Sequence, residues 1–64
     1  MTTGQAIRSA REQARLTQNE LADRIGTTQA MIVRYEKDQQ SPTMNRIRQI
    51  AKALNVRITD LITE

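Results

Sequence analysis

The stretch TQNELADRIGTTQAMIVRYE, residues 17–36, decides the fold of this chain. Thr17 and Glu20 have the T-x-x-E spacing of a capping box, in which each side chain bonds the other residue's backbone N–H at the start of a helix. Gly26 interrupts the apolar pattern, and glycine adopts the left-handed backbone that ends helices at little steric cost. The stretch therefore predicts two short helices joined by a tight turn at Gly26.

Apolar residues recur at intervals of three and four along the rest of the chain, and no segment alternates with the period of two typical of a half-buried strand. We therefore expect an all-α protein, a compact bundle of four to five helices in a single domain, 1–64. The expected helices run from Thr3 to Ala14, from the Thr17 cap to Ile25, from Thr28 to Lys37 and from Thr43 to Leu54, with a helical turn or two in the apolar tail after Asn55.

Each expected helix has one apolar face that can build a core. The pattern is cleanest in the fourth helix, and Leu16 should close the core from the connection before the second. The residues expected to point inward are Ile7, Ala10 and Ala14 in the first helix, Leu21, Ala22 and Ile25 in the second, Ile32 and Tyr35 in the third, Met44, Ile47, Ile50, Ala51 and Leu54 in the fourth, and Ile58, Leu61 and Ile62 in the tail.

Two charged residues fall on these apolar faces. At about 100° per residue, Arg11 lies beside Ile7 and Glu36 lies beside Ile32. A buried charge needs a partner or a route to solvent. We therefore expect Arg11 and Glu36 to form a partly buried ion pair that joins the first and third helices. The alternative is that each side chain reaches solvent independently.

Composition excludes several classes of function. The 64 residues contain neither Cys nor His, which rules out disulfides, thiolate or zinc sites and His-based catalytic pairs. No cofactor or metal is expected. Ten basic and seven acidic residues give a net charge of +3, which suits a polyanionic partner. No apolar run approaches the roughly 20 residues of a membrane span, and no signal-peptide core is present. We expect a cytoplasmic protein without a membrane partner.

Two helices joined by a turn of three to four residues that contains Gly form the helix-turn-helix layout. In DNA complexes the second helix of this unit enters the major groove while the first crosses the backbone. Gln29 can bond adenine bidentately, Arg34 can bond guanine or a phosphate, and Ala30 and Val33 can touch a thymine methyl. Gln18, in the first turn of its helix, is placed to hold a phosphate. The alternative for each side chain is simple solvation.

The chain resembles the phage repressor/Cro-type helix-turn-helix DNA-binding domain family. The matching motifs are R-x-x-x-R-L-T-Q at 11–18, E-L-A-x-x-I-G at 20–26, T-T-Q at 27–29, I-x-x-Y-E at 32–36, Pro42, and A-K-A-L-N-V-x-I-x-x-L-I at 51–62. The resemblance implies a lambda-repressor-like five-helix domain that binds a palindromic operator as a homodimer. It also implies that bases are contacted by Gln29, Ala30, Val33 and Arg34, and phosphates by Gln18, Thr28, Arg11, Lys37 and Gln39.

The chain departs from the family pattern in two connections. Family members commonly have Gly between the first two helices, where this chain has Ala14-Arg15. They also often have Gly and basic residues in the loop after the glutamate, where this chain has KDQQ at 37–40. Because of the second departure, the resemblance gives weaker support to phosphate and dimer contacts from that loop.

The sequence thus predicts a bacterial or phage-encoded transcriptional regulator, a repressor that binds double-stranded DNA sequence-specifically through the Thr28–Lys37 helix. Two alternatives share the fold. One is an antitoxin-type regulator that also binds a toxin, and the other is a coactivator domain that bridges proteins. An enzyme is not expected, because His, Cys and paired carboxylates are missing.

Overall fold

A computed structural model describes residues 1–62 of the chain, and these residues form helices and connections without a strand. The prediction of an all-α fold is confirmed, and each predicted boundary of the first four helices lies within one residue of the observed one. The last two residues of the predicted domain, 63–64, lie outside the described part. The helices are α1 (Thr3–Gln13), α2 (Gln18–Ile25), α3 (Gln29–Glu36), α4 (Met44–Leu54) and α5 (Ile58–Leu61).

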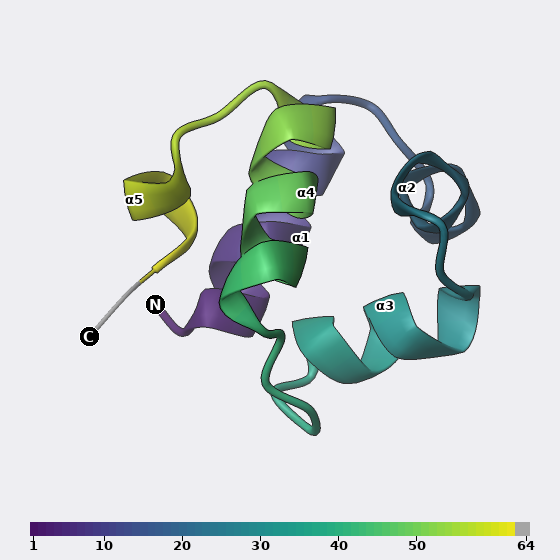
Figure 1. Ribbon diagram of the computed structural model, residues 1–64, viewed down its shortest axis with the longest axis horizontal. Helices are drawn as coiled ribbons and strands as arrows, with labels where there is room; N and C mark the ends of the chain where they lie inside the picture. Colours follow the sequence, from purple (N-terminus) through teal and green to yellow (C-terminus); the bar gives the residue numbers. More distant parts are fainter. Residues whose placement is uncertain (63–64) are drawn as a thin grey trace.

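The helices pack around one core. α1 and α4 lie alongside each other in the middle of the molecule, with α2 and α3 on one side and α5 on the other (Figure 1). α3 contacts both α1 and α2, while α4 contacts α2 and α5. Every helix contributes one large side chain with no exposed surface, and these residues are Ile7, Leu21, Ile32, Ile50 and Leu61.

Side-chain caps fix the start of the first four helices. The Thr17 hydroxyl accepts a hydrogen bond from the Glu20 N–H at 3.1 Å, and the Glu20 carboxylate accepts one from the Thr17 N–H at 2.9 Å. The second bond lowers the pKa of Glu20 below its ordinary value. Thr2 and Gln5 form the same capping box at α1. These local bonds explain why the predicted starts agree with the observed ones.

Left-handed residues end the helices. Among the described residues, positive φ occurs at Arg15 (60°), Gly26 (71°), Asp38 (58°) and Asn55 (57°), one after each of the first four helices. The following N–H then bonds back into the helix, as in the 2.9 Å bond from Gln39 N–H to the Arg34 carbonyl. This is the Schellman arrangement, in which Gly is the usual left-handed residue. Arg15 and Asp38 occupy the two connections where the family commonly has Gly.

Arg15→Gly is therefore expected to stabilise the protein by about 0.5–1 kcal/mol. A left-handed backbone costs a residue with a side chain about 1–2 kcal/mol, and the greater freedom of Gly in the unfolded chain offsets about half of that cost. In thermal denaturation, Tm should rise by roughly 2–8 °C. Arg8→Gly, inside α1, is the matched control and should destabilise by about 1 kcal/mol. A lower Tm for Arg15→Gly would contradict this explanation.

Three residues expected in the core lie at helix ends and are exposed. Met44 is 48% exposed and Ile62 is 42% exposed, and Ala14 is exposed as well. Met44 is the first residue of α4, so its side chain extends toward the helix start, beyond the packed turns. Ala14 and Ile62 follow the last residues of α1 and α5, where helical spacing no longer decides which side a residue faces. The core predictions for these three residues are wrong.

Within residues 1–62, none of the helices has the length and apolar character needed to cross a membrane. α1 and α4 are the longest, at 11 residues each. A transmembrane helix needs about 20 predominantly apolar residues.

Candidate nucleic-acid interface

α3 has one side buried and one side open to solvent. Ile32, Tyr35 and Glu36 are buried against the rest of the domain. The opposite side carries the residues predicted to contact bases, of which Val33 is half-buried and the others are exposed. One face of the helix therefore packs against the domain, and the opposite face is free to contact a partner. This open face consists of Gln29, Ala30, Val33 and Arg34.

A buried ion pair fixes α3 to α1. Arg11 Nε donates to Glu36 Oε2 at 2.6 Å, and Arg11 Nη2 donates to Glu36 Oε1 at 3.1 Å. The side chains are only 11% and 4% exposed. Arg11 Nη1 also donates to the Leu16 carbonyl at 2.8 Å, which ties the connection between α1 and α2 to the same guanidinium. The hydrogen bond to Glu36 raises the pKa of Arg11 above its ordinary value, despite the opposing effect of burial.

Hydrogen bonds through two amide side chains connect the ion pair to the open face of α3. Gln18, the first residue of α2, donates from Nε2 to Glu36 Oε1 at 3.1 Å. Gln29, the first residue of α3, donates from Nε2 to Gln18 Oε1 at 3.4 Å. Glu36 therefore orients Gln18, which in turn contacts Gln29. Sequence spacing predicted a role for each amide separately, but only the fold brings the two together.

A shallow hollow of about 430 Å³ lies at the start of α2. Backbone N–H groups at a helix start carry partial positive charge, which favours an anion. The hollow can therefore accept an anionic group such as a phosphate. Its lining includes two of the predicted phosphate-contacting residues, Arg11 and Gln18, and the full set is Arg8, Arg11, Thr17, Gln18, Asn19 and Gln29.

The other predicted phosphate-contacting residues lie at the two ends of α3. Thr28 caps the start of the helix, where its hydroxyl accepts a hydrogen bond from the Met31 N–H at 3.3 Å. Lys37 and Gln39 are exposed in the loop after the helix. The predicted phosphate contacts thus flank the predicted base contacts at both ends of α3. Their roles in binding stay predictions.

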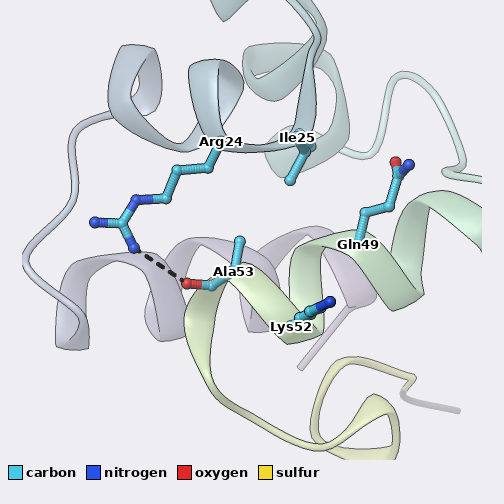
Figure 2. A pocket seen from close by; sticks show the side chains of 5 residues that line it. All are labelled: Arg24, Ile25, Gln49, Lys52 and Ala53. Atoms are coloured by element: carbon cyan, nitrogen blue, oxygen red, sulfur yellow. Dashed lines mark hydrogen bonds between the residues drawn. The ribbon is translucent and has the colours of Figure 1, made fainter.

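A second hollow, of about 480 Å³, lies between α2 and α4 and shares no lining residue with the first (Figure 2). Arg24 reaches across it toward the Ala53 carbonyl, with Nη1 at 3.5 Å from the oxygen. Beside it, Arg46 Nη1 donates to the Ile25 carbonyl at 2.8 Å. Each arginine thus binds a carbonyl at the C-terminal end of the other helix, where the helix itself leaves carbonyls unbonded.

Sequence reasoning missed this cross-link between α2 and α4. Arg46 and Ile25 are 21 positions apart, and Arg24 and Ala53 are 29 positions apart. No local pattern connects residues so distant. A sequence shows only that basic side chains are present, and such side chains can donate hydrogen bonds to free carbonyls at helix C-termini. It does not show which helix supplies the carbonyl.

Known sequences are similar to this chain. A family model described as helix-turn-helix matches residues 7–61. An HTH-type transcriptional regulator of Methanothermobacter thermautotrophicus is 44% identical over 48 residues, which cover 75% of this chain and 70% of the relative. The immunity repressor protein of Bacillus phage phi105 is 28% identical over 64 residues. The chain spans 44% of that repressor's length.

Solved structures share the fold. The P22 c2 repressor, determined in complex with a synthetic operator, superposes with a TM-score of 0.91 at 22% sequence identity and covers 98% of this chain and 96% of its own. The restriction-modification controller protein C.AhdI of Aeromonas hydrophila has a TM-score of 0.89 at 27% identity, covering 94% of this chain and 87% of its own. With the family match and the motifs above, this chain belongs to the phage repressor/Cro-type helix-turn-helix family.

Proposed function

We propose that this chain is the sequence-specific DNA-binding domain of a transcriptional repressor, with α3 in the major groove of its operator. The observation that carries the proposal is the two-sided character of α3, whose buried face is locked to the core while its open face offers polar and small side chains. The phage phi105 relative is an immunity repressor, and the P22 c2 neighbour is a repressor bound to an operator. Both support a repressor of this type.

Gln29 is the residue on which the proposed base readout most depends. Its Nε2 donates one N–H to Gln18, which leaves the second N–H and Oε1 for another partner. One donor beside one acceptor matches N7 and the N6 amino group of adenine. The contact with Gln18 also restricts the amide before DNA arrives, which lowers the entropy cost of binding.

Gln29→Ala should weaken binding to the preferred operator by roughly 1–3 kcal/mol and relax the preference at one base pair of each half-site. The measurement is selection of bound duplexes from a random DNA pool, followed by titration of the selected and altered sites. Gln49→Ala is the matched control, because Gln49 lines the hollow on the other side of α2. Equal weakening on every sequence would show that Gln29 does not read a base.

The same selection tests the assembly on DNA. A domain this small offers few phosphate contacts, so we propose that two copies bind a palindromic operator as a homodimer. The selected sites should then be two-fold symmetric, with half-sites separated by about one helical turn or a multiple of it. A coactivator domain that only bridges proteins would select no sequence, and this outcome would overturn the proposal.

A further inference from the structure

The loop after α3 is tied to the start of α1 by a single carboxylate. Asp38 Oδ2 accepts a hydrogen bond from the Thr2 hydroxyl at 2.6 Å, and Asp38 Oδ1 accepts one from the Gly4 N–H at 3.0 Å. Gly4 lies in the first turn of α1, whose N–H groups lack partners within the helix. Asp38 therefore caps α1 from a distant part of the chain, in addition to the local cap from Thr2.

The junction around Asp38 is closely packed. Gly4 is buried, and a Cβ atom at this position would lie 2.7 Å from the Glu36 carbonyl oxygen and 2.8 Å from Asp38 Oδ1. The backbone of α1 thus lies against the end of α3 itself. Asp38 also takes the left-handed conformation, with a φ of 58°, that lets the loop turn back along α3. Both its backbone and its side chain hold the loop in one place.

The position of this carboxylate is unexpected for a DNA-binding loop. Asp38 is exposed and lies between Lys37 and Gln39, the residues predicted to contact phosphates. A free carboxylate there would repel DNA. The two hydrogen bonds direct it instead toward the N-terminus of α1, whose partial positive charge favours an anion.

We propose that Asp38 is a positioning residue for DNA binding. By bonding Thr2 and Gly4, it fixes the loop after α3 so that Lys37 and Gln39 meet the DNA backbone. The inference rests on the proposed function, and it explains how a loop without the family's usual Gly keeps its shape. It leads to an unusual expectation, namely that removing the hydrogen bonds of this side chain weakens binding to DNA even though a negative charge is removed with them.

Two variants separate the hydrogen bonds from the charge. Asp38→Asn and Asp38→Gly both remove the negative charge, and both residues tolerate a positive φ. Asn keeps an oxygen that can accept from the Gly4 N–H, whereas Gly keeps neither acceptor. We expect Asp38→Asn to bind the selected operator at least as tightly as the original chain. Asp38→Gly should bind about fivefold to tenfold more weakly than Asp38→Asn at 0.1 M salt, the effect of losing about one phosphate contact.

The salt dependence of binding distinguishes positioning from a general loss of structure. Affinities are measured over a range of salt concentrations at a temperature where circular dichroism shows every variant to be folded. The slope of log affinity against log salt should become shallower by about 0.9 for Asp38→Gly and stay unchanged for Asp38→Asn. Lys37→Ala should have a smaller effect in the Asp38→Gly background than in the original chain, because the loop is then no longer held.

Equal affinities and slopes for Asp38→Asn and Asp38→Gly would overturn the inference and leave the proposed function intact. Tighter binding by Asp38→Gly than by Asp38→Asn would do the same, since it would show that the hydrogen bond to the Gly4 N–H does not help binding. Failure of the original chain to bind any selected duplex would overturn the proposed function, and the positioning role with it.

Discussion

Gly4→Ala should lower the free energy of unfolding by about 3 kcal/mol or more, the largest effect we expect from a single methyl group in this protein. The added Cβ would lie 2.7 Å from the Glu36 carbonyl oxygen and closer still to the Tyr35 carbonyl oxygen. Both atoms belong to the backbone, so the strain cannot be relieved by a side-chain rotation. α1 and α3 would have to separate, which would also weaken the bond from the Gly4 N–H to Asp38.

The loss is large relative to the total, because a domain of this length has roughly 3–10 kcal/mol of stability. In thermal denaturation Tm should fall by about 12 °C or more. Gly26→Ala is the matched control. A Cβ at Gly26 would meet nothing within 4 Å, so only its φ of 71° opposes the change, at about 1 kcal/mol. If the two alanine variants have the same Tm, the close approach of α1 to α3 does not determine stability.

Glu36→Gln should lower the free energy of unfolding by about 3–5 kcal/mol. The substitution preserves shape but leaves the buried Arg11 cation facing a neutral amide, at a position where both residues are almost fully covered. One oxygen becomes an NH₂ donor, so Arg11 loses an acceptor whichever oxygen is replaced, and Gln18 loses one too if that oxygen is Oε1. The remaining bond from Arg11 to the Leu16 carbonyl limits the loss but does not neutralise the charge.

Chemical denaturation of Glu36→Gln measures this loss, with Glu12→Gln as the control. Glu12 pairs with Arg8 at 3.6 Å, but the two side chains are 57% and 64% exposed. An exposed pair contributes about 0–1 kcal/mol, so the same chemical change should have little effect there. An unchanged denaturation midpoint for Glu36→Gln would contradict the view that the ion pair fixes α3 to α1.

Much of the fold could be predicted because its signals are local. The Thr17–Glu20 capping box spans three residues, and the left-handed residues that end the helices act through bonds within one turn. Apolar spacing identified the buried face of each helix for the same reason. The errors at Ala14, Met44 and Ile62 lie where a helix begins or ends, because periodicity does not say how far neighbouring helices extend.

The candidate site was only partly predictable. Residue type and spacing on one helix indicated which side chains of α3 point outward. The contacts that hold this helix and the loop after it join residues far apart in the chain, such as Gln18 with Glu36 and Asp38 with Gly4. In the sequence, Gly4 is a glycine in the first turn of an expected helix. Asp38 lies in the loop where the family often has Gly. Neither position indicates that the two residues touch.

The sequence by itself determined the helices, the limits of the first four to within one residue, and the composition of the open face of α3. It could do so because capping bonds, glycine conformations and helical periodicity act over a few neighbouring residues. Only the tertiary structure decided that α1 approaches α3 too closely for any residue but Gly at position 4, and that Gln18 links the buried Glu36 to Gln29. These features depend on how helices dock, because docking brings distant residues within bonding distance.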